Sequence, residues 1–356
     1  MRYLGMDVHA KSTVWCLLNG QGEVLERGRV ATSTAALMEL THELTATEEL
    51  LVGQEVGTMA YLVHDAITAA GVRILSFNAY QLRMIVASRK KTDRRDAYWI
   101  AKALQAGMYP HPVYIPSAPV RELRVLLSQR RVLKAEQNRW RYRARTVLRA
   151  AGCPAPTSPA ALDAALGMPV GSGPTSIPLL PETLALYAQQ ERATRRGLRE
   201  VEARLQASSA PHNAIARLMT IPGIGPLAAA TIYAWVGDVR RFPNAKALGA
   251  YAGLVPTVRQ SGSTQQVGAI TKEGAKPLRA TLIQAAHVVL HRCRSAEAVP
   301  LQRIGERLLG ARSKRRKIVV VAMARHLLRL AYYLLRDGTT YDATRVSANS
   351  PTPVAA

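Results

Sequence analysis

"RYLGMDVHAKSTVWCLLNGQGEVLERGRVA", residues 2–31, decides the fold of the N-terminal part of the chain. Its apolar runs, rich in β-branched and aromatic residues, predict three short strands at 2–8, 12–19 and 23–31. The segments that join them, "HAKS" and "GQG", have the composition of tight turns. The opening of the chain is therefore predicted to be a three-stranded meander.

The sequence after the meander alternates between helical and strand patterns. The predicted elements are, in order, a helix at 34–46, the buried strand "ELLVGQEV" at 49–56, a helix at 58–70, the strand "VRILSFN" at 72–78 and a helix that begins near Thr92. The order β-β-β-α-β-α-β-α is typical of an α/β domain with a mixed sheet. We assign this domain to residues 1–112.

The charge of the chain points to a polyanionic partner. Among its 356 residues, 48 are lysine or arginine and 24 are aspartate or glutamate, so the formal net charge is +24. The excess is spread along the chain, which favours nucleic acid as the partner over a large surface. An acidic membrane surface is the second candidate, and nothing else in the sequence supports it.

The remaining composition favours a reduced, cytoplasmic protein of more than one domain. The longest apolar run, at 317–338, contains Arg325, His326 and Arg329, so it predicts an amphipathic core helix rather than a membrane span. The N-terminus has a strand pattern and does not resemble a signal peptide. The three cysteines, at 16, 153 and 293, are isolated, so we expect neither a disulfide framework nor a structural zinc ion.

Two long helical patterns occupy the centre of the chain, residues 113–210. The first, at 119–150, is strongly basic, and the second runs from 182 to 207. A segment rich in Pro, Ala, Gly and Ser, residues 153–181, separates them and is predicted to be a loop or insertion. This arrangement predicts an antiparallel helical hairpin of the coiled-coil type.

The third region, residues 211–340, is predicted to be mainly helical. "LMTIPGIGPLAAATIYAWVG", at 218–237, has the pattern of a helix-hairpin-helix, in which a glycine turn lets backbone N–H groups approach a phosphate. The last residues, 341–356, have the composition of a disordered tail.

Four carboxylates stand out in the N-terminal domain. If that domain has a ribonuclease-H-like (RuvC-like) sheet, Asp7 lies in the central strand and Glu55 ends the neighbouring one. Asp93 and Asp96 lie three residues apart, so they share one face of the helix that packs back on the sheet. Clustered carboxylates repel one another unless a cation lies between them, and ligands that are all oxygen favour Mg²⁺ or Mn²⁺. The four acids therefore predict a metal centre for phosphodiester chemistry.

Each acid also has an ordinary interpretation. Asp7 suits a turn and Glu55 a strand end, while Asp93 and Asp96 suit the first turn of a helix capped by Thr92, where the helix dipole favours negative charge. The residues alone leave both interpretations open.

Candidate nucleic-acid contacts are basic side chains and turn glycines. They are Arg130, Arg131, Lys134, Arg139, Arg141, Arg143 and Arg145 on the first central helix, Gly223 and Gly225 in the glycine turn, Lys272, and Lys314, Arg315 and Arg316 in a second basic cluster, "GARSKRRKI" at 310–318. Arginine can contact phosphates, and the aromatic residues between them, Trp140 and Tyr142, can stack on unpaired bases. A solvated basic face of the hairpin is the alternative.

Several stretches together resemble one known family. They are "YLGMDVHAKSTVWCLL", "QEVGTMAYLVHDAITAAGVRILSFNAYQLRMIVASRKKTDRRDAYWIAKAL", "LMTIPGIGPLAAATIYAWVGDVRRFPNAKALGAYAGLVP", "SGSTQQVGAITKEGAKPLR" and "VAMARHLLRLAYYLLRDG". The sequence resembles the DEDD insertion-sequence transposases, the family numbered one hundred and ten, whose members are bridge-RNA-guided serine recombinases. The resemblance covers about residues 1–338, except 153–181.

The resemblance implies a RuvC-like nuclease domain, a helical coiled-coil region and a transposase domain. It maps the four family acids onto Asp7, Glu55, Asp93 and Asp96 as catalytic metal ligands. It implies DNA partners (element ends and target), a guide RNA, and a homodimer or homotetramer in which the metal and serine domains form one composite site. A prokaryotic cytoplasm, with association with the nucleoid, is the expected location.

The family also has a nucleophilic serine. Ser261, before the "G-x-I-x-K-x-G" pattern, matches it best. Members often have a second serine just before this position and a glycine two after it; Gln260 and Ser263 occupy these places here, so Ser263 is a rival. A serine–phosphate link would keep the energy of the DNA bond during strand exchange.

Two other functions fit the same residues. A structure-selective nuclease of the Holliday-junction type would use the acids to hydrolyse DNA, without a covalent intermediate. A basic nucleic-acid-binding protein without catalysis would use the acids only structurally.

Overall fold

The structure is a computed structural model. It describes residues 1–46, 48–85, 92–152, 156, 158, 160, 161, 164, 180–261, 264–310 and 316–348. The chain forms two compact units, Met1–Ile115 and Pro116–Ala356. The first unit ends close to the predicted boundary at residue 112.

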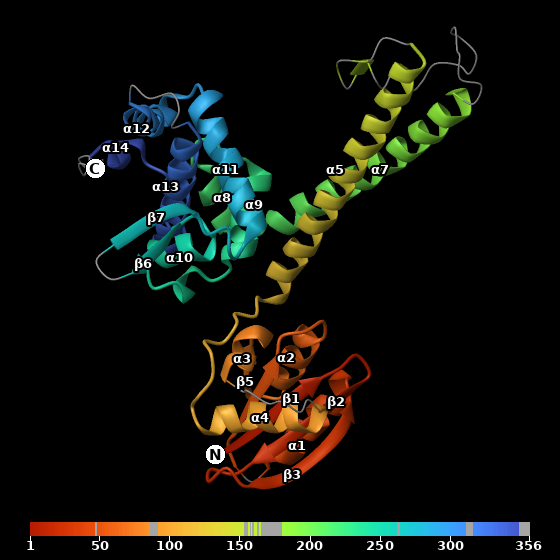
Figure 1. The fold of residues 1–356 in the computed structure, drawn as a ribbon, viewed down its shortest axis with the longest axis vertical. Helices are drawn as coiled ribbons and strands as arrows, with labels where there is room; N and C mark the ends of the chain where they lie inside the picture. The colour runs from red at the N-terminus through yellow and green to blue at the C-terminus, as the bar shows by residue number, and fades with distance from the viewer. Residues whose placement is uncertain are drawn as a thin grey trace. The chain divides into compact units, whose positions relative to one another are not determined.

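The first unit contains a five-stranded mixed sheet with the strand order β3-β2-β1-β4-β5 (Figure 1). Its strands are β1 (Arg2–Val8), β2 (Ser12–Leu18), β3 (Val24–Ala31), β4 (Leu50–Glu55) and β5 (Arg73–Phe77). The first three strands are antiparallel neighbours, whereas β4 runs parallel to both β1 and β5. The predicted meander and mixed α/β sheet are confirmed.

Helices cover both faces of this sheet. They are α1 (Thr34–Thr45), α2 (Ala60–Ala69), α3 (Ala79–Ile85) and α4 (Asp93–Gln105). Leu4 and Met6 of β1 pack with apolar residues of α1 and α2, whereas Val14 and Cys16 of β2 pack with Ala97 of α4. Because successive strand residues point to opposite faces, α4 covers one face of the sheet, and α1 and α2 cover the other.

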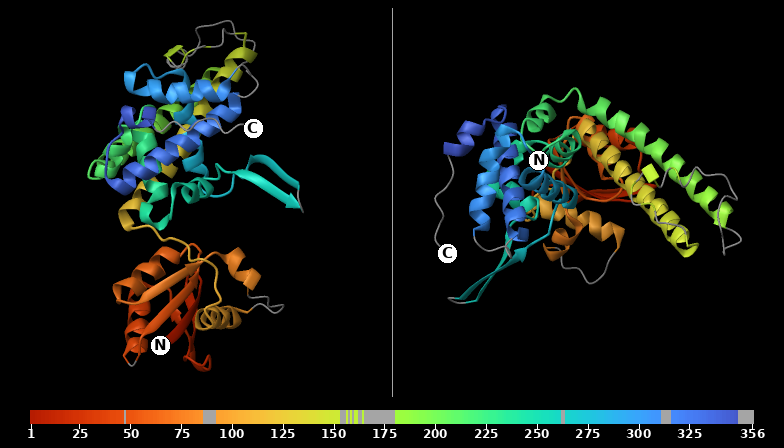
Figure 2. Two further views of the ribbon diagram at one scale, coloured as in Figure 1. Left: turned by 90° about the vertical axis from the view of Figure 1, so that its left-hand side faces the viewer. Right: turned by 90° about the horizontal axis from the view of Figure 1, so that it is seen from above.

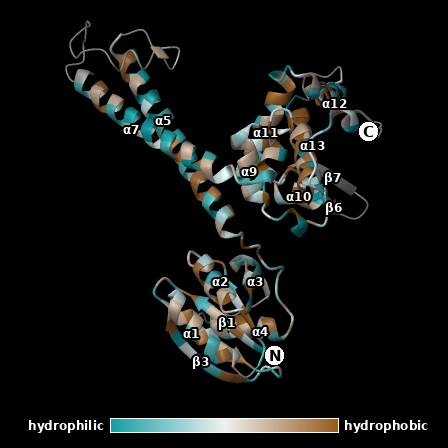
Figure 3. Ribbon diagram, turned by 180° about the vertical axis from the view of Figure 1, so that it is seen from behind, coloured by the Kyte–Doolittle hydropathy of each residue, from teal (hydrophilic) through white to brown (hydrophobic). Residues whose placement is uncertain are grey.

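The second unit begins with two long helices, α5 (Ala118–Ala150) and α7 (Leu180–Ser209). Figure 1 shows them side by side and antiparallel, and residues near the start of α5 meet residues near the end of α7, as in the pair Arg130 and Glu202. Trp140 packs against Tyr187 further along. Figure 3 shows hydrophilic residues alternating with hydrophobic ones along both helices.

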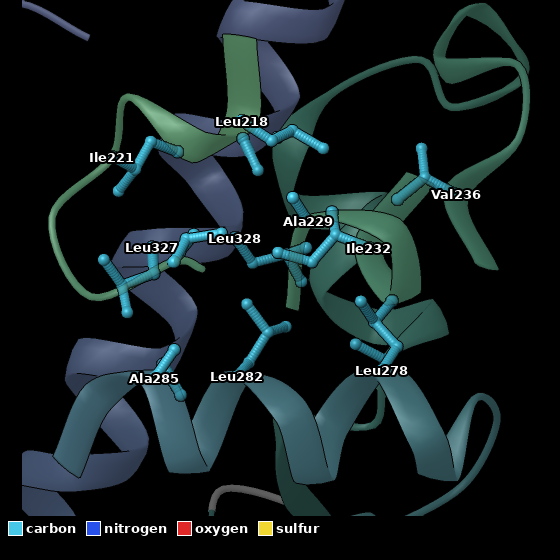
Figure 4. Close-up of a cluster of buried hydrophobic side chains, with 14 of the residues drawn as sticks. Leu218, Ile221, Ala229, Ile232, Val236, Leu278, Leu282, Ala285, Leu327 and Leu328 are labelled. Atoms are coloured by element: carbon cyan, nitrogen blue, oxygen red, sulfur yellow. The ribbon is translucent and has the colours of Figure 1, made fainter. Parts of the chain in front are cut away.

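A helical core completes the second unit. Its elements are α8 (Asn213–Met219), α9 (Pro226–Val236), the 3₁₀ turn η1 (Val239–Arg241), α10 (Ala245–Tyr251), α11 (Lys276–His291), the 3₁₀ turn η2 (Ala296–Ala298), α12 (Val299–Leu309), α13 (Arg316–Asp337) and α14 (Ala343–Ala348). Figure 4 shows how Leu218, Ile232, Leu282 and Leu328 of four of these helices meet in the centre of this core.

The division of this part into two domains, at 113–210 and 211–340, differs from the structure. Leu123, Leu126 and Leu127 of α5 and Leu205 of α7 are buried in the core formed by the C-terminal helices. The base of the helical pair and the C-terminal helices therefore share one apolar core and belong to one unit.

The apolar run at 317–338 forms a core helix, as predicted. By length and composition α13 is the one helix among the described residues that could cross a membrane, but half of its apolar window is buried. Met323, Leu327 and Leu328 are among its fully buried side chains. The apolar residues of this run are therefore explained by their packing in the core of the second unit.

The disordered tail predicted at 341–356 is wrong for its first part. Residues 343–348 form α14, and Tyr341 donates its backbone N–H to the Thr220 hydroxyl at 2.8 Å and its phenol O–H to the Glu297 carbonyl at 3.0 Å. Asp342 accepts the backbone N–H of Thr344 at 2.9 Å, as a helix cap does. Residues 349–356 lie outside the described part.

A two-stranded ribbon extends from the helices of this unit (Figure 2). It consists of β6 (Pro256–Ser261) and β7 (Thr264–Ile270), which pair antiparallel from Pro256 and Ile270 to Ser261 and Thr264.

Candidate functional site

The first two acids lie next to each other at the ends of parallel strands. The pairing of β1 with β4 runs from Arg2 and Leu50 to Met6 and Gln54, so Asp7 and Glu55 are the following pair. Side chains alternate along a strand, so Asp7 shares a face with Gly5, and Glu55 shares it with Gly53. This is the face that α4 covers.

Two glycines allow α4 to lie directly on the strands. A Cβ atom at Gly5 would lie 2.1 Å from the carbonyl oxygen of Ala97, which is closer than real atoms approach. A Cβ atom at Gly53 would lie 2.8 Å from Cδ1 of Leu104. The absence of both side chains therefore sets the depth of α4, whose first turn contains Asp93 and Asp96.

The electrostatics of Asp7 show that the four acids are close enough to interact. Burial raises the pKa of the Asp7 carboxyl; His9 opposes this rise, and Asp96, Asp93 and Glu55 raise the pKa further. The Asp7 side chain is only 18 % exposed. A half-buried carboxylate beside three others is a poor place for negative charge without a cation.

His9 is the residue that sequence reasoning missed. Its Nε2 lies 3.4 Å from Oδ2 of Asp7 and 3.3 Å from Oδ2 of Asp93. Arg29 has a guanidinium nitrogen 4.0 Å from Oδ2 of Asp93. The available signal was the D-x-H spacing at the end of β1, which places both side chains on one face.

The tightest group of possible metal ligands among the described residues is therefore Asp7, His9 and Asp93. One ligand atom from each lies within 4.8 Å of the others. Glu55 and Asp96 lie outside this group, although both raise the pKa of Asp7. Carboxylate oxygens with one imidazole nitrogen suit a divalent cation, so the residues present fit the implied metal.

The helix-start interpretation of Asp93 and Asp96 also holds in part. Thr92 occupies the N-cap position with an extended backbone, but its side chain makes no capping hydrogen bond. Both aspartates lie in the first turn, where the helix dipole favours them. A helix start does not explain why they face Asp7.

The predicted serine lies in the second unit. Ser261 is the last residue of β6 and pairs with Thr264 of β7, so its backbone lies where the ribbon reaches its turn. Its rival Ser263 lies outside the described residues, and the structure does not describe the Ser261 side chain.

The basic residues of α5 do not form one uniform face. Arg130 pairs with Glu202 at 2.8 Å, and Arg139 pairs with Glu136 at 2.6 Å. Lys134 donates to Gln137 at 2.8 Å. These basic groups already have partners on the two helices.

Arg141 departs most from the expected exposed role. It pairs at 2.8 Å with Glu191, whose side chain is 2 % exposed. Arg143 lies over the Trp140 ring, with its guanidinium carbon 4.6 Å from the ring centroid, and is exposed like Arg131. Arg145 is half-buried.

The glycine turn between α8 and α9 is tightly packed on one side and open on the other. Gly223 has φ of +81°, and a Cβ atom there would lie 2.5 Å from Cγ2 of Val289. Gly225 is the N-cap of α9, and a Cβ atom there would meet nothing within 4 Å. The turn thus leaves the N-terminus of α9 accessible.

The last predicted contacts lie before α11 and at the start of α13. Lys272 has φ of 58°, a left-handed conformation that is uncommon for a residue other than glycine. Arg316 begins α13 and is exposed, whereas Lys314 and Arg315 lie outside the described residues.

Comparisons with known proteins identify two family regions. Residues 4–152 match the DEDD transposase model of the IS110 type, and residues 215–299 match the model described as Transposase IS116/IS110/IS902 family. The first region contains the four acids, and the second contains the glycine turn and Ser261.

Curated relatives match over part of their length. A probable family 20 transposase of Pseudomonas aeruginosa is 34% identical over 141 residues, 40% of this chain and 41% of the relative. The transposase for insertion sequence element IS1328 of Yersinia enterocolitica is 30% identical over 146 residues, 41% of this chain and 42% of the relative. A pilin gene-inverting protein of Moraxella lacunata is 32% identical over 126 residues, 35% of this chain and 38% of the relative.

The mixed sheet of the first unit and the helices of the second unit are consistent with a transposase of the DEDD type. The matched region spans about two fifths of the length of these relatives. Two family models of IS110-type transposases thus match successive parts of the chain, and the chain is similar to transposases over both parts.

Proposed function

We propose that the chain is a DNA recombinase of an insertion sequence, which cleaves DNA strands and transfers them with Mg²⁺ or Mn²⁺ bound by Asp7, Glu55, Asp93 and Asp96. The observation that carries this proposal is the meeting of acids from two strands and one helix around the half-buried Asp7. Relatives named as transposases and as a pilin gene-inverting protein support DNA as the substrate.

In this mechanism the four acids bind the divalent ion and hold it in position. A bound divalent ion would neutralise the phosphate and promote attack on phosphorus. The carboxylates would fix that ion, and α4 would keep two of them at the strand ends because Gly5 and Gly53 allow it to pack so closely. The exposed basic side chains of α5 would bind DNA or RNA phosphates.

The transfer step would use Ser261, with Ser263 as the alternative. The serine oxygen forms a bond to phosphorus while the bond from phosphorus to a sugar oxygen breaks, and the hydroxyl proton passes to that sugar oxygen. Attack by a sugar hydroxyl of another strand reverses these changes and releases the serine. One phosphoester replaces another at each stage, so no nucleotide cofactor is required.

The family resemblance extends the proposal to partners and architecture. We infer a guide RNA that selects the sites, a homodimer or homotetramer, a coiled-coil role for α5 and α7, and a helix-hairpin-helix role for α8 and α9. Action on chromosomal DNA would place the protein at the nucleoid. The accessible N-terminus of α9 supports a phosphate contact there.

A cleavage assay tests the metal role of the acids. The protein is incubated with labelled element-end and target DNA, RNA transcribed from the element, and Mg²⁺ or Mn²⁺. We expect Asp96→Asn to abolish strand cleavage and Asp65→Asn, which changes an exposed aspartate of α2, to retain it. Equal cleavage by both variants would contradict the proposal.

A further inference from the structure

Among the described residues, the nitrogen of His9 is the basic side-chain atom nearest to both aspartates of the tight cluster. It lies 3.4 Å from an oxygen of Asp7 and 3.3 Å from an oxygen of Asp93. The two acids come from different elements, β1 and α4. His9 thus faces the same space between them that an ion would occupy.

These distances resemble the spacing of neighbouring metal ligands. Two adjacent ligands of a six-coordinate ion with bonds of about 2.1 Å lie about 3 Å apart. The separations from His9 to the two carboxylates exceed this value by a few tenths of an ångström. The three ligand atoms lie within 4.8 Å of one another, so closing around one ion needs only local movement of these side chains.

The backbone of His9 is held in place by neighbouring strands. Its N–H donates to the Ser12 carbonyl at 3.1 Å, and its carbonyl accepts from the Thr32 hydroxyl at 2.8 Å. Thr32 in turn shares a hydrogen bond of 2.9 Å with Thr13. The ring therefore projects from an ordered turn, which favours a defined role over a chance contact.

Arg29 cannot take the same part. Its nearest nitrogen lies 4.0 Å from Asp93, its side chain is 65% exposed, and a guanidinium has no free electron pair for a metal. In the described part of the chain, Arg29 and His9 are the basic side chains within 4.0 Å of these two acids. Of these two basic side chains, His9 is the one that can bind a metal ion.

We propose that His9 is a ligand of the ion held by Asp7 and Asp93, so that the metal centre contains one mixed imidazole–carboxylate position. This inference rests on the proposed metal role of the acids. Imidazole suits transition-metal ions better than Mg²⁺, so this position favours Mn²⁺ over Mg²⁺. Glu55 and Asp96 would supply only oxygen.

The test uses Mn²⁺ as both ligand and spectroscopic probe. The full-length protein, free of any histidine tag, is titrated with Mn²⁺ without nucleic acid, and free Mn²⁺ is counted by electron paramagnetic resonance. Pulsed spectra of the bound ion then report whether a ¹⁴N nucleus is coordinated. Labelling the protein with ¹⁵N-histidine assigns that nucleus to histidine in the unaltered chain.

Three variants separate the possible outcomes. His64→Asn is the matched control, because His64 also lies beside an aspartate of the first unit, with Nδ1 3.5 Å from Asp65. We expect wild type and His64→Asn to show nitrogen coupling, and His9→Asn to lose it together with roughly tenfold or more of the Mn²⁺ affinity. Asp7→Asn is expected to remove Mn²⁺ binding.

Other results overturn the proposal in distinguishable ways. Mn²⁺ binding that depends on Asp7 but shows no histidine coupling in wild type would leave the metal centre intact and exclude His9 as a ligand. An unchanged or tighter Mn²⁺ affinity in His9→Asn would mean that the imidazole only occupies the place of the ion in the metal-free protein and does not bind it. Binding unaffected by Asp7→Asn would contradict the metal centre itself. The labelling result on wild type stands even if His9→Asn folds poorly.

Discussion

At the scale of single residues, Asp7 is the acid of the site whose pKa is raised by its surroundings. Burial and the three other carboxylates raise its pKa, and His9 lowers it. A carboxyl whose pKa is higher in the folded than in the unfolded state makes folding less favourable as pH rises through that interval, and the loss persists above it.

Asp7→Asn should therefore stabilise the metal-free protein at neutral pH. The gain should shrink as pH falls and disappear below 3.8, the ordinary pKa of aspartate, because Asp7 is then uncharged in both the folded and the unfolded protein. Thermal unfolding in a chelator from pH 4 to pH 8 measures this difference, and added Mn²⁺ should stabilise wild type more than the variant. A variant less stable than wild type at pH 7 would show that His9 already compensates the charge.

The four acids could be selected from the sequence, but the position of His9 between two of them could not be predicted. A strand end and a helix first turn can be recognised from residue type and spacing, which is why Asp7, Glu55, Asp93 and Asp96 could be selected. His9 lies just beyond a strand, and its approach to Asp93 depends on tertiary packing. The Arg141–Glu191 pair was equally hidden, because it joins residues 50 positions apart.

At the scale of elements, close packing of α4 on the sheet determines where its aspartates lie. Gly5→Ala would place a methyl group 2.1 Å from a backbone oxygen of α4, so the helix must move away. We expect a loss of roughly 1–3 kcal/mol in stability and weaker Mn²⁺ binding. Denaturant unfolding and Mn²⁺ titration measure the two effects.

Gly57→Ala is the control for this experiment, because a Cβ atom there would meet nothing within 4 Å. It should change neither quantity appreciably. Equal effects of the two variants would argue against control of the site by helix packing.

The long helical pair depends on one buried polar cluster. Glu191 accepts hydrogen bonds from Gln137 at 3.0 Å, Arg141 at 2.9 Å and Arg195 at 2.7 Å. Glu191→Ala removes the buried carboxylate to which Gln137, Arg141 and Arg195 all donate, so we expect a loss of roughly 3–5 kcal/mol in the free energy of unfolding. Amide hydrogen exchange in α5 and α7 should become faster in Glu191→Ala. Glu200→Ala, at an exposed position of α7, should leave the exchange rates unchanged. Unaltered protection in Glu191→Ala would show that apolar contacts suffice.

Helices and strands followed from periodicity, but domain limits did not. The apolar positions of the first central helix predicted a partner, and the sequence could not show that Leu123, Leu126 and Leu127 pack with the C-terminal helices. The tail was judged by composition, whereas Tyr341 orders it through contacts with distant residues.

At the scale of the whole molecule, the net charge of +24 predicts salt-dependent binding to nucleic acid. The exposed Arg131 and Arg143 should contact phosphates, whereas Arg141 is paired inside the helical pair. Each of Arg131→Gln and Arg143→Gln should reduce the slope of log affinity against log salt by about 1. Arg141→Gln should leave the slope unchanged; fluorescence anisotropy with element-derived RNA and DNA measures all three. A reduced slope for Arg141→Gln alone would reverse this assignment.

The most direct measurement of the central claim is the capture of a covalent protein–DNA link. The protein is incubated with Mg²⁺ or Mn²⁺, element-end and target DNA and element RNA, then denatured and digested, and the DNA-linked peptide is mapped by mass spectrometry. We predict an adduct on Ser261 that disappears in both Ser261→Ala and Asp7→Asn and survives in Ser263→Ala. Metal-dependent cleavage without any adduct, unaffected by Ser261→Ala and Ser263→Ala, would contradict strand transfer through serine and identify a hydrolytic nuclease.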